Sequence, residues 1–435
     1  MNKLQFLWGK LVSTFWFIPI LIVILAIGMA IGLLYLDNLI NYQPGEWVQL
    51  VFSGSADSAR SVLSTISGAM IGVAGTVFSI TLVALTLASS QFGPRLLNNF
   101  MHDRLNQVVL GAYIATYVYC LLVLNSVSQN DALDFIPTIS VFAAILATVA
   151  NIILLIVFIH HIAMSIQADQ VIADISTSLS RNMKTLFPDK LGDNSEKSSP
   201  DLEALKNKYQ HKTAILAQKG GYLQYVDEQL VSETASELDV LLFLKVRPGA
   251  FIVENQNIGE AYALAPRAPG ELDQIHDAFI CGESRTTQQD AEFSIHQMVE
   301  IAARALSPGI NDPFTAIACI DNLCSTLCYL TRVQFPSPYR YDKDNVLRVV
   351  ADSLTFEGML NAAFNQLRQF AGGSPSVMIR LMEALQTIHN FAQDKNQRKA
   401  VEHHARMVIR AAEKHFDEKN DLQDLMERSN FAVQK

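Results

Sequence analysis

Four long stretches without a charged side chain constrain this sequence more than any other feature. No Asp, Glu, Lys or Arg occurs between Lys10 and Asp37, Arg60 and Arg95, Arg104 and Asp131, or Asp134 and Asp169. A helix rises about 1.5 Å per residue, so about 20 apolar residues cross the hydrocarbon core of a bilayer. Because a backbone in lipid must satisfy its own hydrogen bonds, helices are the expected form. We therefore predict four transmembrane helices, near 13–36, 66–90, 107–128 and 136–160.

The basic residues that flank these spans predict their orientation. Lys3 and Lys10 precede the first span, Arg95 and Arg104 separate the second from the third, and Arg181 and Lys184 follow the fourth. The loops on the opposite side of the membrane contain a single basic residue, Arg60. Since cytoplasmic loops carry an excess of Lys and Arg, both termini are expected in the cytoplasm. The apolar part of the first span is too long for a secretory signal, so we expect it to be retained.

The second predicted span differs from the others in its small and hydroxyl-bearing residues. Small residues let helices approach closely, and hydroxyl groups can bond across an interface or line a wet path. The span therefore predicts either a tight packing interface or a pore-lining helix in an oligomer. The candidates are Gly68, Gly72, Gly75, Ser79, Thr86 and Ser89.

A break follows this span. Gly93 and Pro94 should end or bend the helix, because proline has no N–H donor and restricts the residue before it. The connector that follows has apolar residues on one face and is bounded by Arg95 and Arg104, so it suits a short helix at the membrane surface. This layout would suit a gate.

Two segments carry a resemblance to a known family. They read "QFGPRLLNNFMHDRLNQVVLGAYIATYVYCLLVL" and "RTTQQDAEFSIHQMVEIAARALSPGINDPFTA". The wording resembles the prokaryotic membrane-protein family called domain of unknown function 2254, over nearly the whole chain. The resemblance implies a bacterial inner-membrane protein of this arrangement. It implies no activity and no catalytic residue.

The expected fold class is an α-helical membrane protein with a cytoplasmic α+β region. After the transmembrane domain, 1–165, we expect a stalk helix and polar linker over 166–208, where Pro188 stops the helix. Short strand candidates punctuated by glycine turns predict a small β-barrel-like module over 209–268. A helical period then predicts a helical domain over 269–435. The helices within it are expected at 290–306, 313–332, 344–371, 375–394 and 396–416.

The motif "ALSPGINDPFTA" supports two interpretations. Asn311 or Asp312 can cap a helix whose first turn holds Pro313. A capped helix start also offers N–H groups to an anion, and Arg285, His296 and Arg304 are near in sequence. A small anionic ligand could therefore bind at Arg285, His296, Arg304, Asn311 and Asp312. His296 and Glu300 share a helix face, but this spacing also fits a hydrogen-bonded surface, so we predict no metal site.

Several function classes lack support. The net charge of −9 and the absence of a basic stripe argue against nucleic-acid binding. No common hydrolase, ATPase or oxidoreductase signature occurs, so neither an enzyme nor a cofactor is predicted. The leading hypothesis is a homo-oligomeric channel or passive transport protein of the inner membrane, regulated by its cytoplasmic domain. A membrane-anchored sensor or scaffold is the alternative, and a membrane-bound enzyme ranks last.

Overall fold

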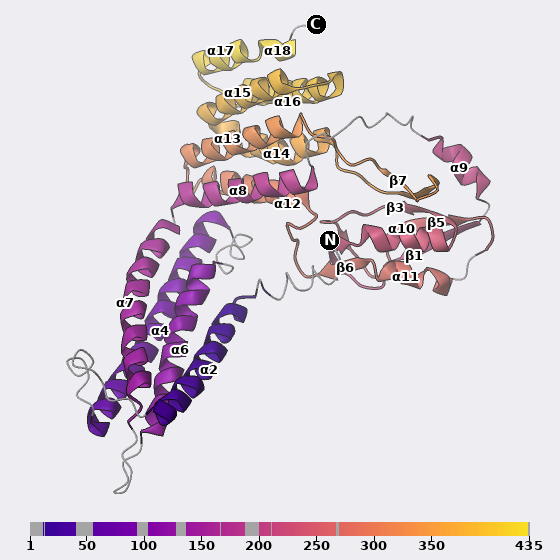
Figure 1. Cartoon of the computed structure of the whole chain (residues 1–435). Coiled ribbons are helices and arrows are strands. Elements are labelled where there is room, and N and C mark those ends of the chain that lie inside the picture. The colour runs from indigo at the N-terminus through magenta and orange to yellow at the C-terminus, as the bar shows by residue number, and fades with distance from the viewer. Residues whose placement is uncertain are drawn as a thin grey trace. The chain divides into compact units, whose positions relative to one another are not determined.

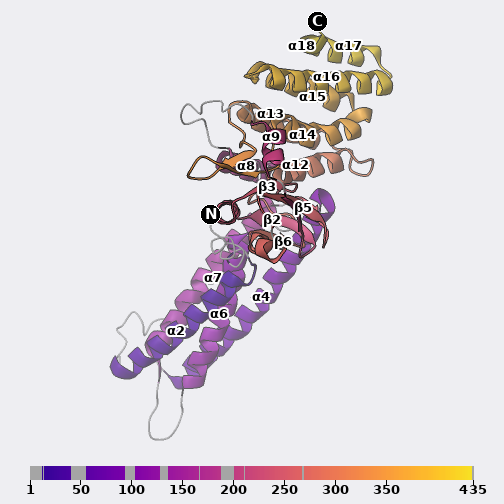
Figure 2. The same ribbon diagram turned by 90° about the vertical axis from the view of Figure 1, so that its right-hand side faces the viewer.

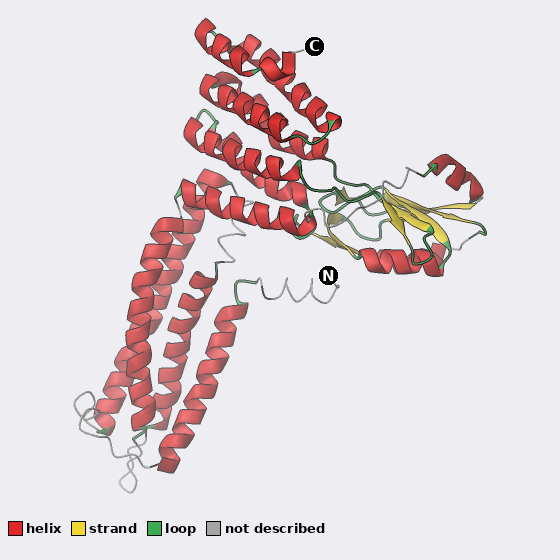
Figure 3. Cartoon of the chain, turned by 45° about the horizontal axis from the view of Figure 1, so that its top comes forward, coloured by secondary structure: helices red, strands yellow, loops and turns green. Residues whose placement is uncertain are grey.

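The computed structural model describes residues 12, 14–40, 55–93, 103–127, 136–165, 167–187, 200–209, 211–266 and 269–433. The chain separates into two compact units, Met1–Gln170 and Val171–Lys435. The strands belong to the second unit, whereas the described residues of the first unit form helices (Figure 3).

The first unit is a set of long apolar helices that run side by side (Figures 1 and 2). They are α2 (Phe17–Ile40), α4 (Ala56–Phe92), α6 (Arg104–Ser126) and α7 (Thr138–Ser165). All four are long and apolar enough to cross a membrane, but so is α13 (Pro313–Leu330) in the second unit. Length and composition alone therefore give five candidates, and the predicted count of four spans is not confirmed by them.

Helix α6 packs against the other three helices of the first unit, and it does so most closely with α2. A Cβ atom added at Gly111 of α6 would lie 2.9 Å from the Cα atom of Pro19 and 2.9 Å from Cδ1 of Ile22. Such separations are too short for real contacts, so only glycine permits this approach of the two backbones.

Polar groups inside the first unit bond to one another. Asp37 of α2 accepts from the backbone N–H groups of Ile139 and Ser140 at 2.9 and 3.0 Å, and thereby caps the start of α7. Asn151 of α7 donates to Thr116 Oγ1 at 2.8 Å, and its carbonyl accepts from the Tyr113 hydroxyl at 2.6 Å. These bonds satisfy groups that would otherwise be costly in an apolar core.

The strands of the second unit form two sheets. The larger has the order β1-β5-β3-β8-β7, in which only the β3–β8 pair is parallel, and the smaller has the order β4-β2-β6. The larger sheet contains β1 (His211–Leu216), β3 (Val240–Leu244), β5 (Asn257–Ala263), β7 (Tyr339–Tyr341) and β8 (Leu347–Val350). The smaller contains β2 (Gly221–Val226), β4 (Phe251–Ile252) and β6 (Phe279–Gly282).

The predicted barrel-like module is not confirmed, although its strand candidates do form strands. Asp227 caps α10 (Glu228–Glu237) by accepting from the Leu230 N–H at 3.2 Å, so the chain leaves the sheet after β2. An edge of β3 then pairs with β8, about a hundred residues further along the chain. A pairing of such long range leaves no local sequence pattern. The start of the helix expected over 344–371 is therefore wrong, because β8 occupies Leu347–Val350 and the helix begins at Phe356.

The remaining chain folds into stacked helices (Figure 1). Helix α12 (Ala291–Ala305) contacts α13 and α14 (Phe356–Phe370), which contact α15 (Pro375–Phe391) and α16 (Lys395–His415) in turn. Two short helices, α17 (Lys419–Arg428) and α18 (Asn430–Val433), complete the stack. Each layer buries the apolar face of its neighbour, as in helical repeat proteins.

Three further α-helices are α8, α9 and α11. The stretch expected to be a stalk contains a separate helix, α8 (Ala168–Leu186), with a buried face that includes Ile175 and Leu179. Its Asn182 donates to Ser294 of α12 at 3.2 Å, so α8 packs within the second unit. The linker 188–199 lies outside the described residues, and α9 (Leu202–Lys208) follows it. The helix α11 (Asp273–His276) precedes β6.

The helical stack buries one histidine in its uncharged form. His404 of α16 is 1% exposed, and its Nε2 atom lies 2.9 Å from Oδ1 of Asn361. Burial, followed by the nearby charges of His403 and Arg368, lowers the pKa of His404 from 6.5 to about 4. The unfolded chain therefore binds this proton more readily than the folded protein does.

This shift predicts a loss of stability in acid. The contribution of His404 is fully present above pH 6.5 and falls by roughly 3 kcal/mol as the pH drops to 4. We expect the apparent melting temperature to decline more steeply over this range in the wild-type protein than in His404→Gln. The exposed His403→Gln variant is the control and should keep most of the slope. Equal slopes for wild type and His404→Gln would contradict the assignment.

Candidate functional site

A cavity of about 470 Å³ lies within the second unit. Its wall is formed by the end of α8, by β2 and α10, by the end of β3, by the start of α12, and by the segment from β7 to Leu354. The parallel β3–β8 pair creates this neighbourhood, because the register Leu242–Val349 sets Ala351 to Leu354 beside the residues that follow β3. Residues a hundred positions apart thus share one wall.

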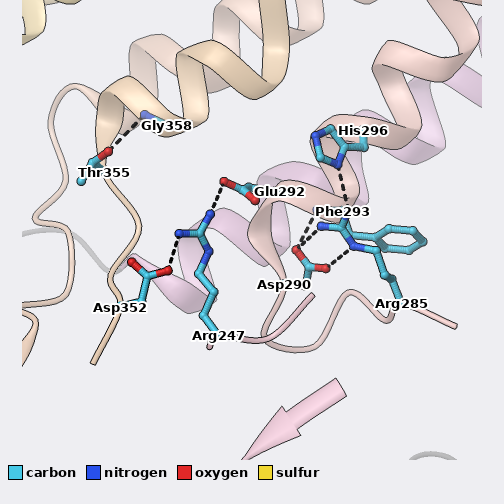
Figure 4. A network of polar contacts seen from close by, with 9 residues as sticks. All are labelled: Arg247, Arg285, Asp290, Glu292, Phe293, His296, Asp352, Thr355 and Gly358. Carbon is cyan, nitrogen blue, oxygen red and sulfur yellow. Dashed lines mark hydrogen bonds and ion pairs between the residues drawn. The ribbon is translucent and has the colours of Figure 1, made fainter. Parts of the chain in front are cut away.

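Arg247 ties three segments of this wall together (Figure 4). It follows β3, and its Nη2 atom donates to Glu292 of α12 at 2.8 Å, while Nη1 donates to Asp352 before α14 at 2.9 Å. Burial lowers the pKa of Arg247, and the two carboxylates more than offset this, so its net pKa lies above the ordinary value. Arg247 is charged, and its charge is fully matched by protein carboxylates.

A second arginine binds the aspartate that caps the start of α12. Asp290, whose side chain is 3% exposed, caps the helix by accepting from the Phe293 N–H at 3.0 Å. Arg285 binds the same carboxylate through two bonds, Nε to Oδ2 at 2.6 Å and Nη2 to Oδ1 at 2.8 Å (Figure 4). This bidentate geometry is the strong form of an arginine–carboxylate pair. Both charges are compensated within the protein.

The same arginine fixes the tautomer of His296. Arg285 Nη1 lies 3.0 Å from His296 Nδ1, and a guanidinium can only donate. The Nδ1 atom must therefore accept, which leaves any ring proton on Nε2.

Gly249 makes room for this cluster. Its φ is +95°, and a Cβ atom there would lie 2.3 Å from Oδ2 of Asp290. The turn after β3 thus approaches the buried carboxylate more closely than any side chain would allow. Its N–H donates to the Leu223 carbonyl at 2.8 Å, which holds the turn in place.

The residues expected to form an anion pocket divide between the two ends of α12. Arg285 and His296 lie together near its start, whereas Arg304 is in its last turn, eight residues and about 12 Å beyond His296. Asn311 has φ +49°, and Asp312 caps α13 by accepting from the Thr315 N–H at 3.1 Å. Binding of an anion by these residues stays a prediction.

The cavity itself was not predicted. Arg247 is not among the candidate residues of the sequence analysis, and Asp352 falls inside the helix expected over 344–371. Among the described residues, no group of three or more His, Cys, Asp or Glu side chains gathers as metal ligands would. Asp290 and Glu292, which lie near His296 in sequence, instead pair with arginines.

The second candidate site is the outer face of α4. Gly68, Gly72 and Gly75 are exposed in the first unit, and a Cβ atom at each would meet nothing within 4 Å. The exposed hydroxyls of Ser79 and Thr86 donate to carbonyls of their own helix, at Gly75 and Leu82, both at 2.9 Å. Ser89 is half-buried. Within the part of the chain that the structure describes, the three glycines therefore do not pack against helices of their own unit.

The end of α4 agrees with the predicted break. The helix ends at Phe92, and Gly93, with φ +110°, donates to the Ser89 carbonyl at 3.1 Å. Arg104 is the first residue of α6. Pro94, Arg95 and most of the predicted surface connector lie outside the described residues.

Comparison with known proteins gives the class of this chain. The family described as "Predicted membrane protein (DUF2254)" matches residues 12–387, and the chain belongs to this family of membrane proteins. Uncharacterized proteins of Mycobacterium bovis and Mycobacterium tuberculosis are each 31% identical to it over 431 residues, which cover 97% of this chain and 80% of the relative. No solved structure matches the chain.

The contact at Gly249 yields a stability prediction. Gly249→Ala should push Asp290 away from Arg285 and strain the backbone, lowering the free energy of unfolding by roughly 2–4 kcal/mol. Thermal unfolding of the purified protein measures this as a drop of several degrees in melting temperature. Gly309→Ala is the control, because a Cβ atom there meets nothing within 4 Å. Equal melting temperatures for the two variants would contradict the proposed contact.

Proposed function

We propose that this protein is an oligomeric channel or passive transport protein of the bacterial inner membrane, regulated by a cytoplasmic second unit. In this proposal α2, α4, α6 and α7 are the four spans, and both termini are cytoplasmic. The basic residues around the predicted spans support the orientation, since Arg104 and Arg181 then lie on the same side as the second unit.

The surroundings of α13 support its exclusion from the membrane. Its mean hydropathy is 1.2, against 1.9 to 2.9 for the other four candidates. It packs against α12, α14 and α15, and its Asp321 pairs with Arg380 of α15 at 2.6 Å. Packing against three helices and an ion pair with one of them favour a place for α13 within the helical stack over a place in lipid.

The outer face of α4 is the single observation that carries the proposal. A run of glycine, serine and threonine along one exposed helix face is a poor match for lipid alone and a good one for a second helix or for water. The buried face of the same helix combines large side chains such as Leu63 and Met70 with small ones such as Ala74, and it contains no glycine. All three glycines of α4 thus lie on the exposed face, which a second copy can reach.

The interior of the first unit supports a path between copies rather than through one copy. Its core contains buried Leu63, Val109, Tyr113 and Phe158, and the bonds of Asn151 and Asp37 are closed within it. A path along the α4 faces of adjacent copies would present hydroxyls and backbone without any ionisable group. Such a lining fits passive permeation better than proton-coupled transport.

Gly72→Leu tests this proposal in purified protein reconstituted into liposomes. The residue has open space around it, so the protomer should fold, and the effect reports on contacts beyond it. We expect the wild type to conduct ions or small solutes under voltage, tension or added ligand, and Gly72→Leu to change that flux at least several-fold with assembly retained. Ser79→Leu should act in the same direction.

Gly28→Leu is the matched control. Gly28 lies on an exposed face of α2, again with nothing within 4 Å of an added Cβ atom, so the same substitution there should leave flux unchanged. Absence of flux in the wild type under all three stimuli would overturn the channel in favour of the anchored scaffold. Loss of the oligomer in Gly72→Leu would assign the face to packing alone.

A further inference from the structure

We infer that the cavity of the second unit binds an amphipathic carboxylate, with its apolar body against the walls and its anionic head on Arg340. The volume of about 470 Å³ lies within the range of small-molecule sites. The inference does not depend on whether the first unit conducts.

The apolar part of the wall determines the body of the ligand. Phe187, Val226, Val231, Val246 and Val349 are all buried residues that line the cavity. They come from β2, α10 and β8 and from the residues that follow α8 and β3, so apolar surface faces the cavity from several sides. Filling it with an apolar group removes that surface from water, which favours binding.

Most of the charged groups on the wall are already matched. Arg247 is held by Glu292 and Asp352, and Asp290 is held by Arg285 and by the N–H of Phe293. Displacing any of these pairs would leave a partly buried charge behind, which is costly. They therefore define the polar edge of the cavity and do not supply a binding group.

Arg340 is the exception on this wall. Its side chain is 32% exposed, and its carboxylate partner among the described residues is Glu228, with Nε and Oε2 3.8 Å apart. The Glu228 side chain is 70% exposed, so that pair is long and screened by solvent. Arg340 also donates to the Ser337 carbonyl, which uses Nη1 and leaves further donors on the guanidinium.

A guanidinium has hydrogen-bond donors but no acceptor atom, so one with unused donors selects an anion. One arginine matches the two oxygens of a carboxylate in a bidentate pair. A phosphate dianion would bring a second negative charge next to Glu228 and Asp352, which also line the cavity. The chemistry on the wall thus favours a single carboxylate attached to an apolar body.

Such carboxylates have two sources, membrane-derived fatty acids and soluble aromatic acids, and probes can separate them. The full-length protein in lipid nanodiscs would be titrated with octanoate and with 4-phenylbutyrate, with saturable binding measured by calorimetry after subtraction of empty nanodiscs. Tighter binding of octanoate indicates the lipid-derived source, and tighter binding of phenylbutyrate the soluble one. Saturable binding of neither acid overturns the inference.

The anionic head is tested with octanol and two variants. We expect octanol to bind at least tenfold more weakly than octanoate, and Arg340→Gln to weaken octanoate at least tenfold while leaving octanol unchanged. Arg410→Gln is the control, because it removes the same charge from an exposed position on α16 and should change nothing. Equal affinity for octanoate and octanol, or unchanged octanoate affinity in Arg340→Gln, overturns the role of Arg340.

The location in the cavity is tested with Ser232→Leu, which adds volume at a half-buried wall position of α10. It should weaken octanoate and octanol alike, with the melting temperature confirming that the variant is folded. Unchanged affinity for both in the folded variant places the binding elsewhere and overturns the inference. Should Ser232→Leu fail to fold, the Arg340→Gln and Arg410→Gln pair still decides the matter.

Discussion

Lipid offers no hydrogen bonds to a polypeptide backbone, and this constraint shapes the first unit of the protein. Its charge-free stretches lie in α2, α4, α6 and α7, and polar groups buried among them, such as Asp37 and Asn151, bond to neighbouring helices. The same constraint makes the outer face of α4 unusual, because the hydroxyls of Thr76, Ser79 and Thr86 donate to carbonyls of their own helix. Such a face is acceptable in lipid but gains most from a second helix or from water.

The sequence predicted those elements whose signal is local. The long apolar segments, the end of α4 before Gly93 and the cap of α13 by Asp312 depend on residues a few positions apart. The sheet topology could not be predicted in this way, since β3 pairs with β8 across a hundred residues and α10 interrupts the strands. Alternation along the chain predicts a strand, but it does not name the partner of that strand.

The same limit explains what the sequence missed at the cavity. Arg285 and His296 were singled out and do lie together, because they flank one helix start. Arg247, Glu292 and Asp352 meet only after the β3–β8 pairing has formed. Arg340 stands on the cavity wall for the same reason, since it lies in β7, the strand next to β8. A cavity assembled from three distant segments thus has no contiguous motif.

The proposals for both units depend on one topology, with four spans and a cytoplasmic second unit. Reporter fusions test it most directly, with green fluorescent protein or alkaline phosphatase placed in turn at the N-terminus and the C-terminus of the full chain in a Gram-negative host. We expect fluorescence and no phosphatase activity at both ends. An active phosphatase at the C-terminus alone would mean an odd number of spans, with α13 as the fifth, and would contradict the account of the second unit as a cytoplasmic ligand-binding domain.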